Sequence, residues 1–251
     1  MVDKTITVIV ASLNEEANIA AVINNVLMAV NGKFDDYEII LFDDCSSDRT
    51  GEIIDNLAAC NSKIKAIHNS RNMGFGYNFN KGVKLARMNY ISILPGDNEI
   101  ELKGIEEMFS RVGLVDIIVP YVVNKNVRTI SRRLISKTYV LIMNMLFKCG
   151  LRYYTGPAIV RADILKKIPL KTNDFAFMSA ILVRAIRRGH SFMEVPISIC
   201  CRLGGKSKAF KIKNVISVFS TIMKLFWEIE ISQGNEYNKF KKSINSSKIL
   251  I

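Results

Sequence analysis

The first hundred residues alternate between two hydrophobic periods. Short apolar runs rich in β-branched residues are typical of buried strands, and they span residues 5–11, 37–43, 63–68 and 90–94. Between them, apolar side chains recur every three or four residues, which predicts helices near residues 19–30, 47–60 and 77–87. Strands that alternate with helices and lack hairpin turns form parallel sheets with right-handed crossovers. We therefore predict a doubly wound, mostly parallel α/β fold.

Polar or glycine-containing segments follow each of these strands. In a doubly wound sheet, ligands bind beyond the carboxyl ends of the strands. Two of the segments carry acids directly after a buried strand, Asp43 and Asp44 in one and Asp97 and Glu99 in the other. Such oxygen ligands suit a hard divalent cation that keeps its remaining positions for water and phosphates. We therefore predict a binding edge at the ends of these strands.

The second half of the chain is less regular. Its pattern predicts helices near residues 128–147 and 175–188 and a strand near 192–199. The first of these helices has a basic face, formed by Arg128, Arg132, Arg133 and Lys137. Such a face binds an anionic group or simply lies in solvent, and the sequence leaves both interpretations open.

Residues 212–231 form a strongly apolar segment whose polar side chains lie on one narrow stripe at helical spacing. Charged residues leave no uncharged run of the roughly 18–20 residues that a membrane span needs. Two interpretations remain, a helix that lies in a membrane interface and a helix that packs on the domain.

The charge balance calls for an anionic partner. The net charge is +12 and the isoelectric point is near 9.5, which suits nucleic acid, an anionic bilayer or a phosphate-bearing substrate. The chain lacks the usual nucleic-acid-binding signatures, and acids at the predicted edge would repel phosphate unless a metal intervened, so we expect no nucleic acid. The five cysteines show no paired spacing and the N-terminus does not resemble a signal peptide. We therefore expect a cytoplasmic protein.

Several short motifs resemble one known family when they are read in order. They are residues 9–15 (IVASLNE), 43–50 (DDCSSDRT), 71–76 (RNMGFG), 96–97 (GD), 155–156 (TG) and 194–197 (EVPI), followed by Arg202, Gly205, Ser207 and Lys208. Together they resemble glycosyltransferase family 2 with its GT-A fold, most closely the dolichol-phosphate mannose synthase and polyprenyl-phosphate glycosyltransferase group. The resemblance covers residues 5–226, and each motif alone would be weak.

The resemblance implies an inverting hexosyltransferase that depends on Mg²⁺ or Mn²⁺ and uses a GDP- or UDP-linked sugar. It implies that the metal is held by Asp97 and Glu99. The implied donor-binding residues are Ala11, Leu13, Glu15, Phe42, Asp44, Gly96 and Asp97. The implied catalytic residues are Asp97, Arg202 and Lys208, and the acceptor phosphate would meet Arg132, Arg133, Arg202 and Lys208. The chain departs from the family pattern at Ala11, Leu13 and Pro95, which replace proline, tyrosine and the first acid of the DxD motif.

The acceptor is predicted from acids that are missing. Family members that act on a sugar hydroxyl carry an acidic pair as base, where this chain has Phe177 and Met178. A phosphate monoester is mostly dianionic at neutral pH and needs no base. We therefore expect a polyprenyl or dolichyl phosphate acceptor, with the protein peripheral on the cytoplasmic face of a membrane. A saccharide hydroxyl acceptor, a degenerate nucleotide-sugar-binding module and a membrane-anchoring partner subunit stay open as alternatives.

The resemblance and the hydrophobic pattern together give three predicted regions. They are a catalytic GT-A domain at residues 1–210, an amphipathic membrane-surface helix at 211–234 and a flexible basic tail at 235–251.

Overall fold

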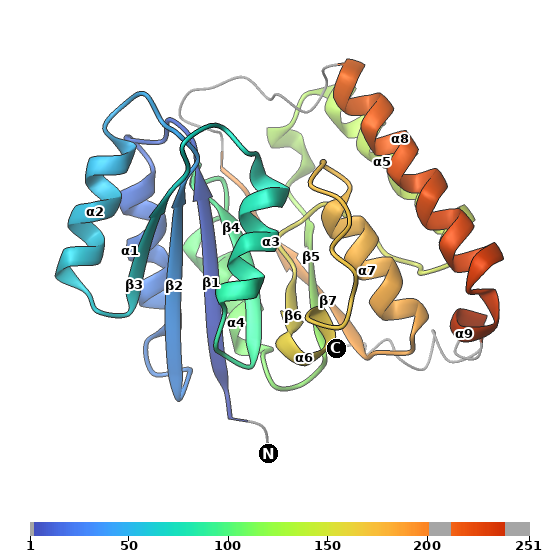
Figure 1. Cartoon of the computed structure of the whole chain (residues 1–251), viewed down its shortest axis with the longest axis horizontal. Coiled ribbons are helices and arrows are strands. Elements are labelled where there is room, and N and C mark those ends of the chain that lie inside the picture. The colour runs from blue at the N-terminus through green and yellow to red at the C-terminus, as the bar shows by residue number, and fades with distance from the viewer. Residues whose placement is uncertain (1–2, 201–211, 239–251) are drawn as a thin grey trace.

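A computed structural model describes residues 3–200 and 212–238. A twisted sheet crosses the molecule, with helices on both faces (Figure 1). Its strands are β1 (Thr5–Ser12), β2 (Asp36–Asp43), β3 (Ile64–His68), β4 (Tyr90–Pro95), β5 (Ile117–Val122), β6 (Ile159–Arg161) and β7 (Phe192–Ile197). The seven-stranded sheet has the order β3-β2-β1-β4-β6-β5-β7. This confirms the predicted doubly wound α/β architecture.

The strand directions bring most carboxyl ends to one edge of the sheet. β1 runs parallel to β2 and β4, and β3 runs parallel to β2. β6 is antiparallel to both β4 and β5, so β5 points the same way as β4, and β7 is parallel to β5. After β1 the chain adds β2 and β3 on one side of β1, and it then crosses over to add β4 on the other side. The strand order therefore reverses at β1, and sheets of this kind bind ligands at such a topological switch point.

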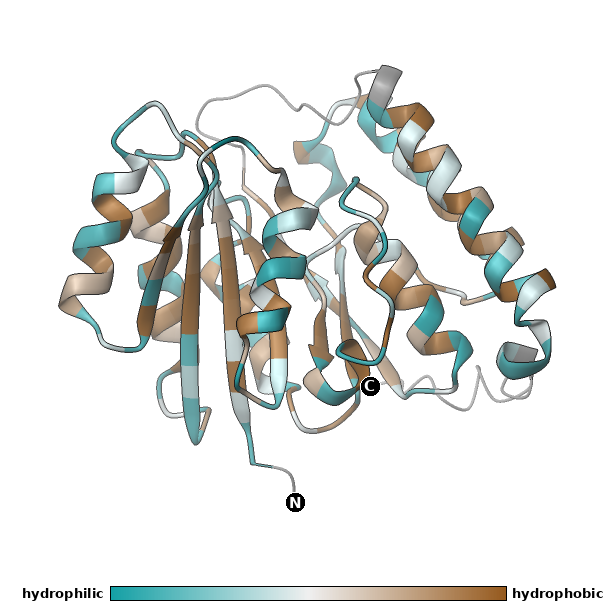
Figure 2. Ribbon diagram, viewed as in Figure 1, coloured by the Kyte–Doolittle hydropathy of each residue, from teal (hydrophilic) through white to brown (hydrophobic). Residues whose placement is uncertain are grey.

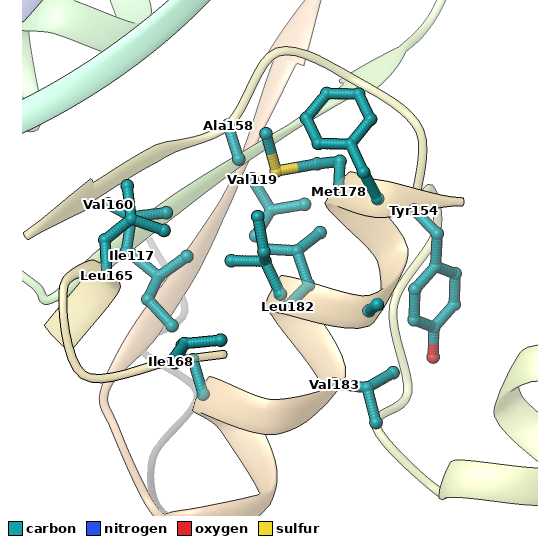
Figure 3. Packing of buried hydrophobic residues seen from close by; sticks show 14 of the residues in the cluster. Ile117, Val119, Tyr154, Ala158, Val160, Leu165, Ile168, Met178, Leu182 and Val183 are labelled. Carbon is teal, nitrogen blue, oxygen red and sulfur yellow. The ribbon is translucent and has the colours of Figure 1, made fainter. Parts of the chain in front are cut away.

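Two hydrophobic cores cover the two faces of the sheet. One face packs against α1 (Ile19–Val30), α2 (Thr50–Cys60) and α4 (Leu102–Ser110). The other packs against α3 (Phe75–Leu85), α5 (Ile130–Phe147), α6 (Ala162–Leu165), α7 (Phe177–Arg187) and α8 (Ile212–Phe226). Every residue of α7 is buried. Figure 3 shows Met178 and Leu182 of this helix packed among Val119 of β5 and Val160 of β6.

Short elements complete the described chain. A 3₁₀ turn, η1 (Lys125–Val127), precedes α5, and a π-helical turn, η2 (Trp227–Ser232), leads from α8 into α9 (Gly234–Asn238). The predicted tail therefore begins within α9, and residues 239–251 lie outside the described residues. Within the described ranges, no helix is both long enough and apolar enough to cross a membrane.

Helix α8 and the turn after it direct part of the polar stripe toward the domain. The hydroxyls of Ser217 and Thr221 donate to one carboxylate oxygen of Asp174, at 2.9 and 2.6 Å. Near the end of the helix, Arg184 of α7 donates two hydrogen bonds to the carboxylate of Glu228, at 2.8 and 2.9 Å. The hydrogen bonds from Arg184 hold the pKa of Glu228 below its ordinary value. The stripe therefore attaches α8 to the domain.

The opposite side of α8 is apolar and exposed. Its outward residues, which begin within α8 and continue into η2, are Val215, Ile216, Phe219, Met223, Trp227 and Ile231. Figure 2 shows hydrophobic residues recurring along α8. Exposed hydrophobic residues also recur along the neighbouring helix α5. The two helices are in contact through the rings of Phe147 and Phe226, whose centroids are 6.5 Å apart. The described chain thus presents two amphipathic helices whose outer sides are largely hydrophobic.

We predict that Glu228→Gln loosens α8 from the domain. The side chain of Arg184 is only 6% exposed, and a buried charge that loses its partner destabilises the folded state by about 3–5 kcal/mol. Urea unfolding followed by the fluorescence of Trp227, which precedes Glu228, should show a lower midpoint for the variant. The control is Lys224→Gln, which changes an exposed charge of α8. Equal midpoints for both variants and the unmodified protein would contradict the docking described above.

Candidate active site

The ends of β1, β2 and β4 form the core of the predicted binding edge. Ala11 of β1 lies opposite Phe42 of β2 on one side and opposite Pro95 of β4 on the other. The chain after β4 stays close, because the amide of Gly96 donates to the carbonyl of Ala11 at 3.0 Å. A Cβ atom at Gly96 would lie 2.7 Å from that of Ser12, so only glycine fits there. Three of the predicted donor residues are thus gathered at the switch point.

Asp44 continues this edge directly after β2. It is buried, and its amide donates to the carbonyl of Ser12 at 2.9 Å. Its carboxylate accepts hydrogen bonds from the side chain of Asn69 and from the amides of Met73 and Gly74, at 2.9, 2.9 and 2.8 Å. The acid therefore holds the 69–74 loop against the edge of the sheet. Its contact with the base or ribose of a nucleotide stays a prediction.

The loop after β1 is tied to the loop after β2. Asn14 has a left-handed backbone, with φ of 57°, and its side-chain oxygen accepts from the amide of Ser47 at 2.8 Å. The amide of Glu15 donates to the hydroxyl of Thr50 at 2.8 Å. Leu13 and Glu15, which the resemblance places beside the base, therefore lie in a braced loop next to Asp44.

His68 lies at the end of β3 between two acids. Its Nδ1 is 3.1 Å from Asp43 and its Nε2 is 2.9 Å from Asp55. The hydrogen bonds with Asp55 and then Asp43 raise the pKa of His68 above its ordinary value. Burial raises the pKa of Asp43, but hydrogen bonds from Ser46 and His68 overcome this and hold it below its ordinary value. No ligand spacing in the sequence pointed to these partners, because the three elements meet only in the fold.

Asp97 and Glu99 follow β4 on the other side of β1. Asp97 is 3% exposed, and one of its carboxylate oxygens accepts from the amide of Glu99 at 3.2 Å. Asn98, with φ of 52°, accepts a hydrogen bond from the side chain of Asn25 in α1 at 3.1 Å. The turn that carries both acids is therefore anchored to β1 and α1. Asp97 and Asp44 lie beyond the two strands that flank β1.

Asp97 and Glu99 at this turn stay the predicted ligands of a divalent ion. Among the described residues, no group of three or more His, Cys, Asp or Glu side chains gathers closely enough to hold a metal. Mg²⁺ is commonly bound through one or two carboxylates and completed by water and substrate phosphates. Asp97, with Glu99 beside it, is the carboxylate pair that suits such a site.

Arg202 and Lys208 lie outside the described residues. The described chain that leads to them passes the metal candidates, because the amide of Cys200 donates to the carbonyl of Glu99 at 2.7 Å. Their predicted roles toward phosphates therefore stay predictions.

A second feature, a cationic cavity, lies between the end of β5 and α5. Its volume is about 370 Å³, and five of its lining side chains are basic, namely Lys125, Arg128, Arg133, Lys137 and Arg152. Arg133 was predicted to meet an acceptor phosphate and does line the cavity, whereas Arg132 is not among the lining residues. Lys125 and Arg152 were not predicted, because Lys125 precedes the predicted basic helix and Arg152 follows it. Since β5 runs parallel to β4, the cavity shares the sheet edge with Asp97.

The two positions where some family members carry an acidic pair belong to the hydrophobic core of this chain. Phe177 and Met178 begin α7 and are both buried. The ring of Phe177 packs against Phe75 and Phe79 of α3, with centroids at 5.9 and 5.2 Å. These two positions therefore provide no carboxylate that would deprotonate a hydroxyl.

Sequence comparison agrees with this geometry. Residues 7–169 match the profile of the family described as glycosyl transferase family 2. Glycosyltransferase AglD from Haloferax volcanii is 24% identical over 213 residues, which are 78% of this chain and 32% of that protein. The uncharacterized glycosyltransferase EpsJ from Bacillus subtilis is 34% identical over 107 residues, 43% of this chain and 29% of that protein. The chain spans less than a third of the length of these relatives.

Solved structures show the same fold. Glucosyl-3-phosphoglycerate synthase from Mycobacterium tuberculosis, in complex with Mn²⁺, UDP-glucose and phosphoglyceric acid, gives a TM-score of 0.63 at 14% identity over 89% of this chain and 79% of that chain. The same synthase with Mg²⁺ and UDP gives 0.65 at 14% identity over 88% and 79%. The sheet and its helices are therefore of the GT-A type. Because the family profile covers more than half of the 251 residues, the chain belongs to glycosyl transferase family 2.

Proposed function

We propose that the chain transfers a sugar from a nucleotide-sugar donor to a polyprenyl or dolichyl phosphate at a membrane surface, with inversion at the anomeric carbon. The observation that carries the proposal is the orientation of α8. Its polar stripe is bound to the domain by Asp174 and Arg184, and its apolar side faces outward. A helix of this kind is suited to the interface of a bilayer, where a lipid acceptor resides.

The nucleotide-sugar donor is proposed to bind at the switch point, beyond the ends of β1, β2 and β4. A nucleotide diphosphate there would meet the braced loops beside Asp44 and the turn that carries Asp97 and Glu99. Solved relatives of this fold hold UDP or UDP-glucose together with Mn²⁺ or Mg²⁺. When bound, such an ion stabilises the negative charge that develops on the leaving diphosphate. We propose a UDP- or GDP-linked sugar as the donor.

The choice of a lipid phosphate as acceptor rests on the first two residues of α7, which are buried. Phe177 and Met178 fill core positions, so no carboxylate stands there to deprotonate a hydroxyl. A phosphate oxygen needs no such base, because it is already anionic at neutral pH. It would form the new bond to the anomeric carbon as the bond to the donor diphosphate breaks. We propose that Arg202 and Lys208 contact these phosphates, together with Arg132 and Arg133.

Membrane attachment is proposed to use α5 and α8 together. The outward residues of both helices are large and apolar, and the surface also carries the exposed cations Lys137 and Lys224. Apolar insertion combined with attraction to anionic lipids is how amphipathic helices bind at an interface. The expected location is the cytoplasmic face of a membrane. A membrane-anchoring partner subunit that covers the same surface is the competing outcome.

The reaction is tested by incubating the purified chain with a panel of UDP- and GDP-sugars, Mn²⁺ and a short-chain polyprenyl phosphate. We predict a lipid-linked sugar whose anomeric configuration is opposite to that of the donor. Asp97→Asn should lower turnover by about 10²–10³-fold, because charge stabilisation of the leaving group is lost. Asp3→Asn, an exposed acid at the far end of the chain, is the control. Transfer to saccharide hydroxyls alone, or retention of configuration, would contradict the proposal.

Membrane attachment is tested by sedimentation with vesicles that contain anionic phospholipid. The double variant Phe219→Glu with Met223→Glu should bind at least about ten-fold more weakly, because two apolar side chains no longer enter the interface. Leu114→Glu is the matched control, since this leucine is also exposed but follows α4 rather than lying on α5 or α8. Should the unmodified chain fail to sediment with vesicles, a covering subunit would be favoured over direct attachment.

A further inference from the structure

Both ring nitrogens of His68 face carboxylates, which come from two different elements. Nδ1 is 3.1 Å from Asp43 at the end of β2, and Nε2 is 2.9 Å from Asp55 in α2. An ionised carboxylate only accepts hydrogen bonds, and a neutral imidazole carries a single N–H donor. Only the imidazolium can therefore donate to both acids at once. For this reason the contacts with Asp55 and Asp43 raise the pKa of His68 above its ordinary value.

The other charged side chains near this ring are directed elsewhere. Gly51 at the start of α2 lies against the imidazole, and a Cβ atom there would be 3.6 Å from the ring. Of the charged residues beside it, Arg49 and Glu52 pair with each other at 3.0 Å, and Asp48 accepts from the amide and the hydroxyl two residues on. Lys65, three residues earlier on β3, points to the opposite face of the sheet. The two contacted carboxylates are thus the charges that act on the ring, against the opposing effect of its partial burial.

Asp43 extends this contact into the loops of the binding edge. Its second carboxylate oxygen accepts from the amide of Ser46 at 2.9 Å, and the hydroxyl of Ser46 accepts from the amide of Asn14 at 3.0 Å. The side chain of Asn14 in turn accepts from the amide of Ser47 at 2.8 Å. A continuous series of hydrogen bonds therefore runs from His68 to the loops after β1 and β2.

Both loops contain a residue in an unfavourable backbone conformation. Cys45 has a φ of 67° and Asn14 has a φ of 57°. Left-handed backbone is uncommon for residues other than glycine, and it persists where surrounding contacts hold it in place. Asparagine tolerates this region better than cysteine does, so the turn at Cys45 depends strongly on the hydrogen bond between Asp43 and Ser46. Loosening Asp43 would release the turn that follows Asp44.

We propose that His68 is a positioning residue for the nucleotide-sugar donor: its charged ring holds Asp43 and, through Asp43, the loops on either side of Asp44. The inference rests on the proposed function, because it assumes that the donor binds at this edge. His68 acts through Asp43 and does not touch the donor. When the ring loses its proton, one of its two carboxylate contacts loses its donor. Donor affinity is therefore expected to be highest below the raised pKa of His68 and to fall as the pH rises through it.

Calorimetry with UDP and with GDP, each in the presence of Mn²⁺, measures the affinity of the donor site of the full chain at a series of pH values. The affinity of the unmodified chain should fall about three- to ten-fold as His68 loses its proton, because one hydrogen bond that supports the loops is lost. His68→Gln cannot become charged. It should bind about three- to ten-fold more weakly at low pH and should lose this pH dependence.

Asp55→Asn gives a sharper result, because it changes an exposed side chain that is remote from the donor. It removes the carboxylate at Nε2 and should lower the pKa of His68, so the fall in affinity should move to lower pH. Glu52→Gln, which changes another exposed acid of α2, is the matched control and should keep the unmodified profile. An unchanged profile in both His68→Gln and Asp55→Asn would overturn the proposal.

NMR of the imidazole rings follows the same event without a ligand. The chain has two histidines, so His190→Gln assigns their signals and should leave the donor profile unchanged. The amide signals of Ser46 and Asn14 should shift with the same midpoint as the ring of His68. Saturating nucleotide should raise that midpoint, because coupling between two binding events is reciprocal.

The outcomes separate the role of His68 from the proposed reaction. Loop amides that do not respond to the ring would overturn the positioning role. Nucleotide binding that does not depend on pH would also overturn it, while the donor site would stand. If the loop amides follow the ring but neither nucleotide binds at any pH, the support that His68 gives to the loops is upheld and the proposed donor site is rejected.

Discussion

The parallel register of β1 between β2 and β4 is the constraint on which the rest of the structure depends. It places Phe42 and Pro95 opposite Ala11, and it sets Asp44 and Asp97 beyond the strands on either side. The glycine at 96 and the carboxylate of Asp44 then hold the following loops close to this edge. Candidate binding residues that are more than fifty positions apart in sequence thus come to one edge of the sheet, because the carboxyl ends of parallel strands lie along the same edge.

A second arrangement extends the same edge toward α5 and α8, the two helices with hydrophobic outer sides. β6 reverses direction between β4 and β5, so the cavity beside α5 opens on the edge that carries Asp97. α8 is fixed to α7 through Arg184 and Glu228, which leaves its hydrophobic side outward. A donor at the switch point and a lipid phosphate arriving along α5 would thus approach the same region from different sides.

Much of the first half of the fold was predictable because its strands are continuous β-branched runs and its helices have a clear period. β6 was not predicted, since three residues such as Ile159–Arg161 carry too little pattern. Asn14 adopts a left-handed turn that joins two loops, a conformation that no periodicity in the sequence indicates. The acids Asp44 and Asp97 followed from the positions of the strand ends, whereas the other candidate donor-binding residues came only from the family resemblance. The cavity was not predicted, because Arg128 and Arg152 are equivalent to other surface cations until the fold pairs them with tyrosines.

Anomalous scattering from Mn²⁺ in crystals grown with a UDP- or GDP-sugar tests the central claim most directly. The account predicts one Mn²⁺ bound to the carboxylate of Asp97 and to the donor diphosphate, with the nucleotide over the ends of β1 and β2. Mn²⁺ held away from Asp97, or a nucleotide lodged in the cavity beside α5, would contradict it.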